Sequence, residues 1–359
     1  MSGPAAAARR PRVTVLGASG FVGSVVLGAL ARRPLRLRAV ARGAVAVPPA
    51  GRADVEVVAA DLTDPEVLRA AVAGSDAVVH LVSHSAGWRG TGRPDEALGR
   101  TNAGVMSSLL TALRQERGRR GGAPVVVLFA GSTSQAGPGA PIPVDESAPD
   151  APASPYDRQK AAAERELLAA TAEGAVRGAC LRLPTVYGRG APAGRGDRGV
   201  LATMVRRALA GEPLTMWHDG SVLRDLLHVD DTGRAFLAAL DRPDAVAGRH
   251  WVLGTGHGEP LGRVFRAIAD GVAVRTGRPA VPVVSVPPPE HALPTDLRST
   301  VADSSRFRAA TGWRPLIPLD AGLADLIANL ADLADLADLA PATGRSGGTT
   351  AGPHRPARP

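Results

Sequence analysis

The stretch Val13-Thr14-Val15-Leu16-Gly17-Ala18-Ser19-Gly20-Phe21-Val22-Gly23 joins a short apolar run to a turn that contains three glycines. Val22, Val25, Val26 and Leu30 recur at helical spacing, so a helix is expected after the turn. Glycines let the backbone approach a ligand closely, and a helix N-terminus offers unpaired N–H groups to a phosphate. The stretch is therefore typical of a pyrophosphate site for a dinucleotide, with the spacing G-x-x-G-x-x-G in place of G-x-G-x-x-G.

Four further apolar runs follow, with helix-like segments between them: Leu35 to Val40, Val55 to Val58, Ala77 to Val82 and Val125 to Phe129. Alternating strands and helices are typical of an α/β fold with a doubly wound parallel sheet. We therefore predict a Rossmann sheet. Asp61-Leu62 follows the run Val55 to Val58, where the carboxylate could accept the adenine amino group; the alternative is a helix N-cap before Thr63 to Val72.

The composition fits a globular protein, since 45% of the 359 residues are apolar. The only cysteine, Cys180, lies in an apolar run, which indicates a core strand and a reducing cytoplasm. No run of 18 apolar residues occurs, so no membrane span is expected. The net charge of +8 does not predict nucleic-acid binding, because several arginines fall in the chain ends, and arginines also hold phosphates.

The stretch Ser154-Pro155-Tyr156-Asp157-Arg158-Gln159-Lys160 holds the only lysine among 42 basic residues and one of two tyrosines. Tyr156 precedes Lys160 by one helical turn, so the two side chains would leave the same face of a helix. A nearby ammonium favours the phenolate, so Lys160 would lower the phenol pKa and suit Tyr156 to acid/base chemistry. The alternative is an ordinary exposed helix turn.

Several motifs resemble the extended short-chain dehydrogenase/reductases that act on nucleotide sugars. They appear in the order of that family and span roughly residues 12 to 330: Gly17, Gly20 and Gly23, Asp61-Leu62, His80-Leu81, Asn102, Ser132, Tyr156, Lys160, Leu181-Arg182 and Gly312-Trp313-Arg314-Pro315. Within the family, the chain is most similar to NDP-4-keto-6-deoxyhexose 4-ketoreductases of deoxysugar biosynthesis, enzymes of antibiotic and other natural-product pathways.

The resemblance implies roles for individual residues. The implied catalytic residues are Ser132, Tyr156 and Lys160. The implied cofactor-binding residues are Gly17, Ser19, Gly20, Phe21, Val22, Gly23, Arg42, Asp61, Leu62, Tyr156 and Lys160. The implied substrate-binding residues are Ser83, Ser132, Thr185 and Arg224, of which Arg224 would grip the nucleotide diphosphate or, alternatively, lie on the surface. The Asp-Glu pair of related dehydratases is replaced by Thr133 and Ser134, which removes the acid and base of dehydration.

The expected organisation is a dinucleotide-binding half, formed by residues 12–183 and about 222–256, and a smaller, discontinuous sugar-binding half, formed by about 184–221 and 257–340. Residues 1–11 and 341–359 are expected to be disordered. Gly190 to Asp197 reads as a mobile loop, and a helix is expected from Val200 to Leu209. Leu323, Leu326, Leu330 and Leu333 mark one helical face, from which the following Ala-Asp-Leu repeats should drift because three does not match 3.6.

These observations predict an enzyme that uses NADPH to reduce the C4 keto group of an NDP-4-keto-deoxyhexose. The second strand ends in Ala41-Arg42 without the carboxylate typical of NAD-binding relatives, which favours NADPH over NADH; Arg36 or Arg38 could compete for the role of Arg42. Alternatives are an NAD-dependent nucleotide-sugar 4-epimerase and, in another class, a redox-sensing dinucleotide-binding regulator. The histidines show no metal-ligand spacing, His84 is a second proton-donor candidate, and a homodimer is left open.

Overall fold

The computed structural model describes residues 9–47, 51–83, 99–120, 122–190, 199–217, 219–290 and 292–339. The predictions for residues 1–8, for His84, for most of the loop from Gly190 to Asp197 and for the tail lie outside these residues. The elements are β1 (Arg12–Leu16), α1 (Phe21–Ala31), β2 (Arg36–Ala41), β3 (Asp54–Ala59), α2 (Pro65–Val72), β4 (Ala77–His80), η1 (Arg100–Gly104), α4 (Val105–Arg120), β5 (Val125–Ser132), η2 (Thr133–Ala136), α5 (Pro155–Ala172), β6 (Val176–Leu183), β7 (Thr185–Tyr187), α6 (Val200–Leu209), β8 (Leu214–Met216), β9 (Leu223–His228), α7 (Val229–Asp241), α8 (Pro243–Val246), β10 (His250–Val252), β11 (Gly258–Pro260), α9 (Leu261–Thr276), β12 (Val283–Ser285), η3 (Pro294–Leu297), α10 (Ser305–Thr311) and α11 (Leu319–Leu339).

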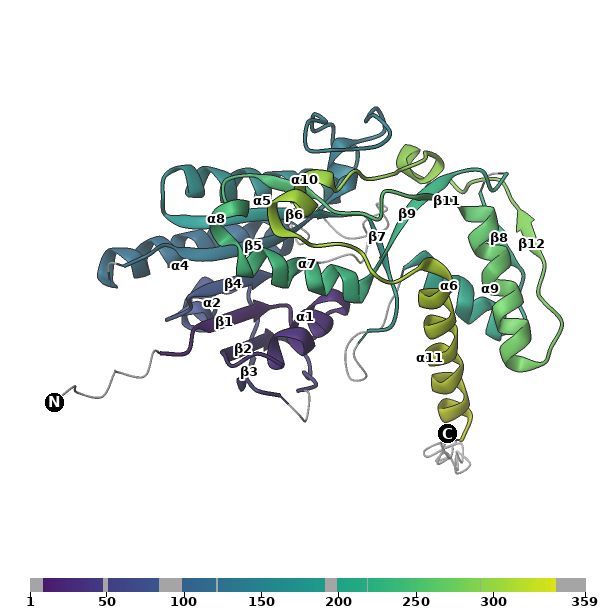
Figure 1. Ribbon diagram of the computed structural model, residues 1–359, viewed down its shortest axis with the longest axis horizontal. Coiled ribbons are helices and arrows are strands. Elements are labelled where there is room, and N and C mark those ends of the chain that lie inside the picture. The colour runs from purple at the N-terminus through teal and green to yellow at the C-terminus, as the bar shows by residue number, and fades with distance from the viewer. Residues whose placement is uncertain are drawn as a thin grey trace, which may run out of the picture.

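The main sheet of the described chain has seven strands in the order β10-β6-β5-β4-β1-β2-β3, and neighbouring strands pair in parallel (Figure 1). Strand β1 pairs with β2 on one side and with β4 on the other. The chain builds the sheet outward from β1 on one side through β2 and β3, and then crosses back to build the other side from β4 onward. The strand order therefore reverses at β1, and a crevice is expected at the carboxyl end of this strand. The predicted doubly wound Rossmann sheet is confirmed.

Helices cover both faces of this sheet because its strands are apolar on both sides. On one face, Leu27 of α1 and Phe236 of α7 share a core with Val15. On the other face, Leu109 of α4 and Leu167 of α5 share a core with alternate residues of the same strands, and α2 joins them. Cys180 is fully buried in β6, as its apolar run predicted.

A separate hydrophobic core lies beyond the main sheet, where Figure 1 shows α6, α9 and α11 beside short strands. Strands β11, β9 and β7 form a three-stranded sheet here, and β12 pairs with β8. Strand β9 belongs to this smaller sheet, whereas β10, which follows it, belongs to the main sheet. The chain thus passes repeatedly between the two cores. The predicted boundaries of the two halves stay a prediction.

Helix α11 carries the leucine stripe and the first Ala-Asp-Leu repeats. Leu323 and Leu326 are buried, whereas Leu333 is 52% exposed. Leu333 was predicted on the same face as Leu323 and Leu326, and this part of the prediction is wrong. The apolar stripe drifts off the packed face as predicted, but it has already left that face at Leu333, because the period of three does not match the helical repeat. In α6, the predicted bounds of Val200 to Leu209 are confirmed.

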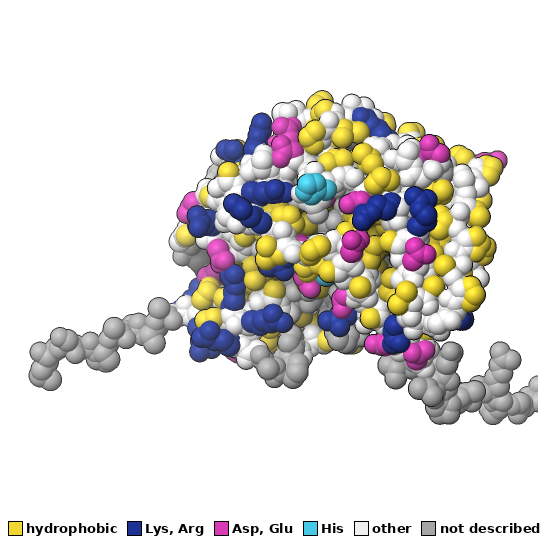
Figure 2. All heavy atoms as spheres, turned by 45° about the vertical axis from the view of Figure 1, so that its right-hand side comes forward, with side chains coloured by type: hydrophobic (Ala, Val, Ile, Leu, Met, Phe, Trp, Pro, Cys, Tyr) yellow, Lys and Arg dark blue, Asp and Glu magenta, His cyan; other side chains and the backbone are white. Residues whose placement is uncertain are grey.

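On the face shown in Figure 2, basic side chains are interspersed with acidic and hydrophobic ones, and these basic groups are arginines because the only lysine, Lys160, is buried. Several of the arginines form exposed ion pairs, such as Arg33 with Asp241 and Arg114 with Glu173. Along the described residues, the structure has no helix with the length and apolar character that a membrane span requires.

Candidate active site

The glycine turn after β1 is shaped by close backbone contacts. Gly17 adopts φ +85°, and a Cβ there would lie 3.0 Å from the backbone of Leu81. A Cβ on Gly23 would lie 2.1 Å from the Gly17 carbonyl oxygen, so α1 packs directly on the turn. Helix α1 begins at Gly20 without a side-chain cap, which leaves its first N–H groups for a ligand. The turn therefore fits the pyrophosphate of a dinucleotide.

The end of β2 lies beside this turn, because the N–H groups of Gly17 and Ala18 both donate to the Val40 carbonyl. Arg42 follows and is exposed. Arg38, which could compete with it, instead pairs its guanidinium with Glu56 and donates to the Ala71 carbonyl. Arg42 is thus better placed than Arg38 to meet a ligand at the strand end.

Asp61 lies after β3 and accepts hydrogen bonds from the N–H and hydroxyl of Thr63 at 3.0 and 2.8 Å. These bonds lower the pKa of Asp61. The alternative of a helix N-cap at this position is wrong. Asp64 caps α2 instead, because its carboxylate accepts from the N–H groups of Glu66 and Val67 and Pro65 suits the first helical position.

Helix α5 carries Tyr156 and Lys160 on one face, as predicted. It begins at Ser154, which forms a capping box with Asp157, and Pro155 follows at the first helical position. Lys160 is buried, its Nζ donates to the Ala130 carbonyl at 2.8 Å, and it lies 5.7 Å from the centroid of the Tyr156 ring. The Tyr156 hydroxyl hydrogen-bonds the Ser83 side chain.

The electrostatics of this pair differ from expectation. Burial raises the pKa of Tyr156 to about 12, and the charge of Asp157 adds to the rise while the bond with Ser83 opposes it. Burial lowers the pKa of Lys160 to about 8. The predicted lowering of the phenol pKa by Lys160 is therefore wrong for this structure. Burial destabilises the phenolate more than the hydrogen bond with Ser83 stabilises it, so the net shift of the pKa is upward.

Ser132 ends β5 and begins the short helix η2. Its N–H donates to Oε1 of Gln135 at 2.9 Å, and its Oγ lies 2.7 Å from Oγ of Ser134. Ser134 in turn donates to Oδ1 of Asp157 at 2.5 Å. The roles of Asp157 and Gln135 were missed in the sequence, although the Ser154-x-x-Asp157 pattern is a recognisable capping box.

A buried polar network supports this strand end. Glu164, one turn after Lys160, accepts from Nε2 of Gln135 and from two nitrogens of Arg182, and Nδ1 of His250 lies 3.2 Å away. Burial would raise the pKa of Glu164, but the bonds from His250 and Arg182 and the charge of Arg182 outweigh it, so this pKa lies well below its usual range. Glu164 thereby holds Gln135, which holds Ser132.

A cleft of about 200 Å³ opens where the two cores meet. Its wall includes Ser132, Tyr156, Thr185 and Arg224. Three predicted substrate residues therefore meet at one opening, and the fourth, Ser83, contacts Tyr156. Because Gly17 packs on Leu81, two residues before Ser83, the glycine turn is connected to the cleft through one short segment.

Arg224 is engaged differently from the prediction. Its guanidinium donates to the carbonyls of Leu223, Thr295, Asp296 and Arg298. These bonds hold the segment around η3 against β9. They also occupy both terminal nitrogens of the guanidinium with backbone carbonyls. The predicted contact between Arg224 and a diphosphate stays a prediction.

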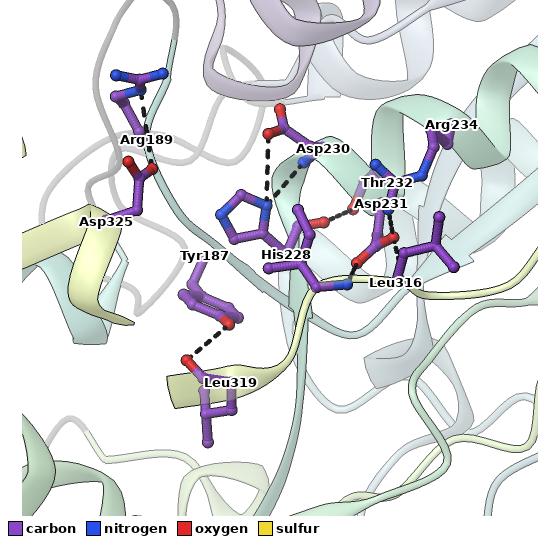
Figure 3. Close-up of polar contacts among 11 residues, drawn as sticks. Tyr187, Arg189, His228, Asp230, Asp231, Thr232, Arg234, Leu316, Leu319 and Asp325 are labelled. Carbon is purple, nitrogen blue, oxygen red and sulfur yellow. Dashed lines mark hydrogen bonds and ion pairs between the residues drawn. The ribbon is translucent and has the colours of Figure 1, made fainter. Parts of the chain in front are cut away.

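Tyr187 and His228 meet at the junction between β7, β9 and α11 (Figure 3). Their rings pack edge to face with centroids 5.4 Å apart. Next to them, the buried carboxylate of Asp231 accepts from the Leu316 N–H and pairs with Arg234 (Figure 3). These contacts tie α7 to the chain that leads into α11, so Tyr187 packs within the junction.

The glycine turn, the parallel sheet and the meeting of Ser132 and Tyr156 above Lys160 define the class of short-chain dehydrogenase/reductases. More particularly, the model of the NAD dependent epimerase/dehydratase family matches residues 13–254, and the chain belongs to this family. Among the described residues, no group of three or more His, Cys, Asp or Glu side chains could hold a metal ion.

Three relatives illustrate the range of similarity. The chain is 32% identical to a 2'-dehydrokanamycin reductase of Streptomyces kanamyceticus, over 88% of this chain and 79% of that protein. It is 29% identical to a UDP-glucose 4-epimerase of Mycolicibacterium smegmatis, over 88% and 97% of the two chains. The structure of a Thermus thermophilus UDP-glucose 4-epimerase in complex with NAD matches with a TM-score of 0.70 at 27% identity, over 88% and 98%.

Proposed function

We propose that this protein uses NADPH to reduce the C4 keto group of a nucleotide-linked 4-keto-deoxyhexose to a hydroxyl. The observation that carries the proposal is the meeting of Ser132, Tyr156 and Thr185 at one cleft that is joined to the glycine turn through Leu81 and Ser83. Relatives named as a reductase and as epimerases of sugars support the sugar substrate.

The residues take distinct roles in this reaction. Bound NADPH would supply the hydride to the carbonyl carbon. Tyr156 donates its proton to the carbonyl oxygen, and its raised pKa keeps the phenol in the protonated form that a donor needs. Ser132 donates a hydrogen bond to the same oxygen as charge develops there. The Lys160 ammonium lies 5.7 Å from the centroid of the Tyr156 ring and would bind the nicotinamide ribose.

The lining of the cleft includes apolar side chains that suit a deoxysugar. Pro138, Pro141 and Ile142 are among these residues, and Ile142 is 46% exposed. A methyl group in place of a hydroxymethyl would lie against such a wall at no cost in unpaired hydrogen bonds. This arrangement supports a 6-deoxy substrate.

A second substrate class, a keto sugar without a nucleotide, is favoured by Arg224. Its bonds to four carbonyls reduce the donors available to a diphosphate. A relative is also named for reduction of 2'-dehydrokanamycin. The two classes share the keto chemistry of the site and differ in the group beyond the sugar ring.

The test is a panel of nucleotide-linked 4-keto-deoxyhexoses and nucleotide-free keto sugars, each incubated with NADPH or NADH. We expect stoichiometric loss of NADPH absorbance with a 4-keto sugar, and NMR identifies the new hydroxyl. Epimer interconversion without added reductant, or purification with tightly bound NAD, would instead establish the 4-epimerase. A protein that binds the dinucleotide and turns over no ketone would be the redox-sensing regulator.

We expect kcat/KM for ketone reduction to fall as the pH rises through about 8. Lys160 carries its charge below its pKa of about 8 and loses it above. Loss of the charge weakens the charge-assisted hydrogen bond that Lys160 would make to the nicotinamide ribose. A pH profile of the initial rate checks this expectation, with Lys160→Met as the variant whose low activity no longer falls at that pH. A wild-type profile that stays flat to higher pH would contradict it.

Cofactor choice should follow the end of β2. Replacing Ala41→Asp together with Arg42→Ala should shift the ratio of kcat/KM for NADPH over NADH toward NADH by at least about tenfold, because a charged contact to the 2'-phosphate is lost and a repulsive carboxylate is added. Arg38→Ala is the matched control, since that guanidinium is already paired with Glu56. An unchanged ratio in the double variant would place the 2'-phosphate contact elsewhere.

A further inference from the structure

The hydroxyl groups of Ser132 and Ser134 and the carboxylate of Asp157 form a continuous hydrogen-bonded chain at the cleft. The Oγ atoms of the two serines lie 2.7 Å apart, and Oγ of Ser134 lies 2.5 Å from Oδ1 of Asp157. The other carboxylate oxygen accepts from both the N–H and the hydroxyl of Ser154. Asp157 is 3% exposed, so the chain ends on a buried anion.

The chemistry of these groups sets the direction of the chain. An ionised carboxylate only accepts hydrogen bonds, so Ser134 must donate its single proton to Asp157. The contact between the two serines then requires Ser132 to donate to Ser134. The N–H of Ser134 also donates to Oγ of Ser132, at 3.3 Å. Before a substrate binds, the Ser132 proton is therefore turned away from the cleft.

We propose that Asp157 is a positioning residue that, through Ser134, withholds the Ser132 proton from the ketone until charge develops on the carbonyl oxygen. This inference rests on the proposed ketone reduction. A neutral carbonyl competes with Ser134 for one proton, whereas an oxygen that takes up negative charge is the stronger acceptor. The bond from Ser132 is then made mainly in the transition state, where it accelerates the reaction rather than tightening substrate binding.

The sign of the effect on binding separates this role from a structural one. In Ser134→Ala the competing acceptor is gone, so Ser132 donates to the ketone in the ground state. The dissociation constant of the ketone should fall by about three- to tenfold, the range that one net hydrogen bond represents. Asp157→Asn should act in the same direction. Ser154 still donates to the amide oxygen, so the amide nitrogen faces Ser134 and turns its proton toward Ser132.

The experiment measures the dissociation constant of the ketone in the ternary complex with oxidised NADP, which cannot turn over, and kcat and KM with NADPH. The variants are Ser134→Ala, Asp157→Asn and the rescue Ser134→Thr, which keeps the hydroxyl and should restore wild-type ketone binding. Asp64→Asn is the matched control, because Asp64 caps α2 as Asp157 caps α5. Ser134→Ala leaves the cap of α5 in place if Asp157→Asn does not fold.

Tighter ketone binding in Ser134→Ala, with kcat lowered more than kcat/KM, supports the inference. Unchanged or weaker binding in Ser134→Ala overturns it, while a wild-type enzyme that reduces the ketone leaves the proposed function standing. A wild-type enzyme that reduces no ketone of the panel overturns the proposed function and this inference together.

Discussion

Tyr156→Phe is expected to lower kcat for ketone reduction by about 10²- to 10⁴-fold, the usual contribution of a general acid. The phenylalanine ring fills the same space at the start of α5, so only the proton and the bond with Ser83 are lost. The dissociation constant for NADPH should stay nearly unchanged. Steady-state rates and a fluorescence titration of NADPH measure the two quantities separately.

Tyr187→Phe provides the matched control, because the chain has only these two tyrosines. Tyr187 is buried at the junction with α11, and its hydroxyl makes one long bond of 3.4 Å to the Leu319 carbonyl. Its loss should leave kcat close to wild type. Near wild-type turnover in Tyr156→Phe would remove this residue from the reaction.

Glu164→Ala is expected to lower the free energy of unfolding by at most about 3–5 kcal/mol, the cost of breaking a buried ion pair, because Arg182 keeps a second carboxylate partner in Asp150, 2.8 Å away. Arg182 is 2% exposed and donates twice to this carboxylate, while Gln135 and His250 would lose an acceptor. Urea unfolding followed by circular dichroism measures the loss. The kcat for ketone reduction should also fall, because Glu164 holds Gln135 and Gln135 positions Ser132.

Glu173→Ala, on the exposed end of the same region, is the control for the loss of a glutamate. Its ion pair with Arg114 is exposed on both sides, so the free energy of unfolding should change by at most about 1 kcal/mol. Equal losses in the two variants would mean that burial adds nothing to the Glu164 pair. Because the pKa of Glu164 is lowered on folding, its contribution is present above its ordinary pKa of 4.5 and is lost as the pH falls below that value.

The sequence by itself determined the strands from β1 to β5 and their order, whereas the short strands β7 to β12 were not predicted. The apolar runs predicted the strands because periodicity is a local property, and the glycines after β1 predicted a turn because only glycine adopts φ +85° without strain at Gly17. The lone lysine one turn after Tyr156 predicted a shared helix face. Ser132 was predicted because its segment resembles the family motif at the end of this strand. Each of these predictions depends on residues that are close along the chain.

The tertiary structure alone decided the electrostatics and the partners. Ser134 and Asp157 are 23 residues apart, and Arg224 and Thr295 are 71 apart, so no local pattern brings them together. The pKa of Tyr156 also depends on how much water the packed cores exclude, which reverses the shift expected from Lys160 alone. Desolvation and long-range pairing arise only when distant segments pack, and this is why the direction of the hydroxyl chain at the cleft required the folded chain.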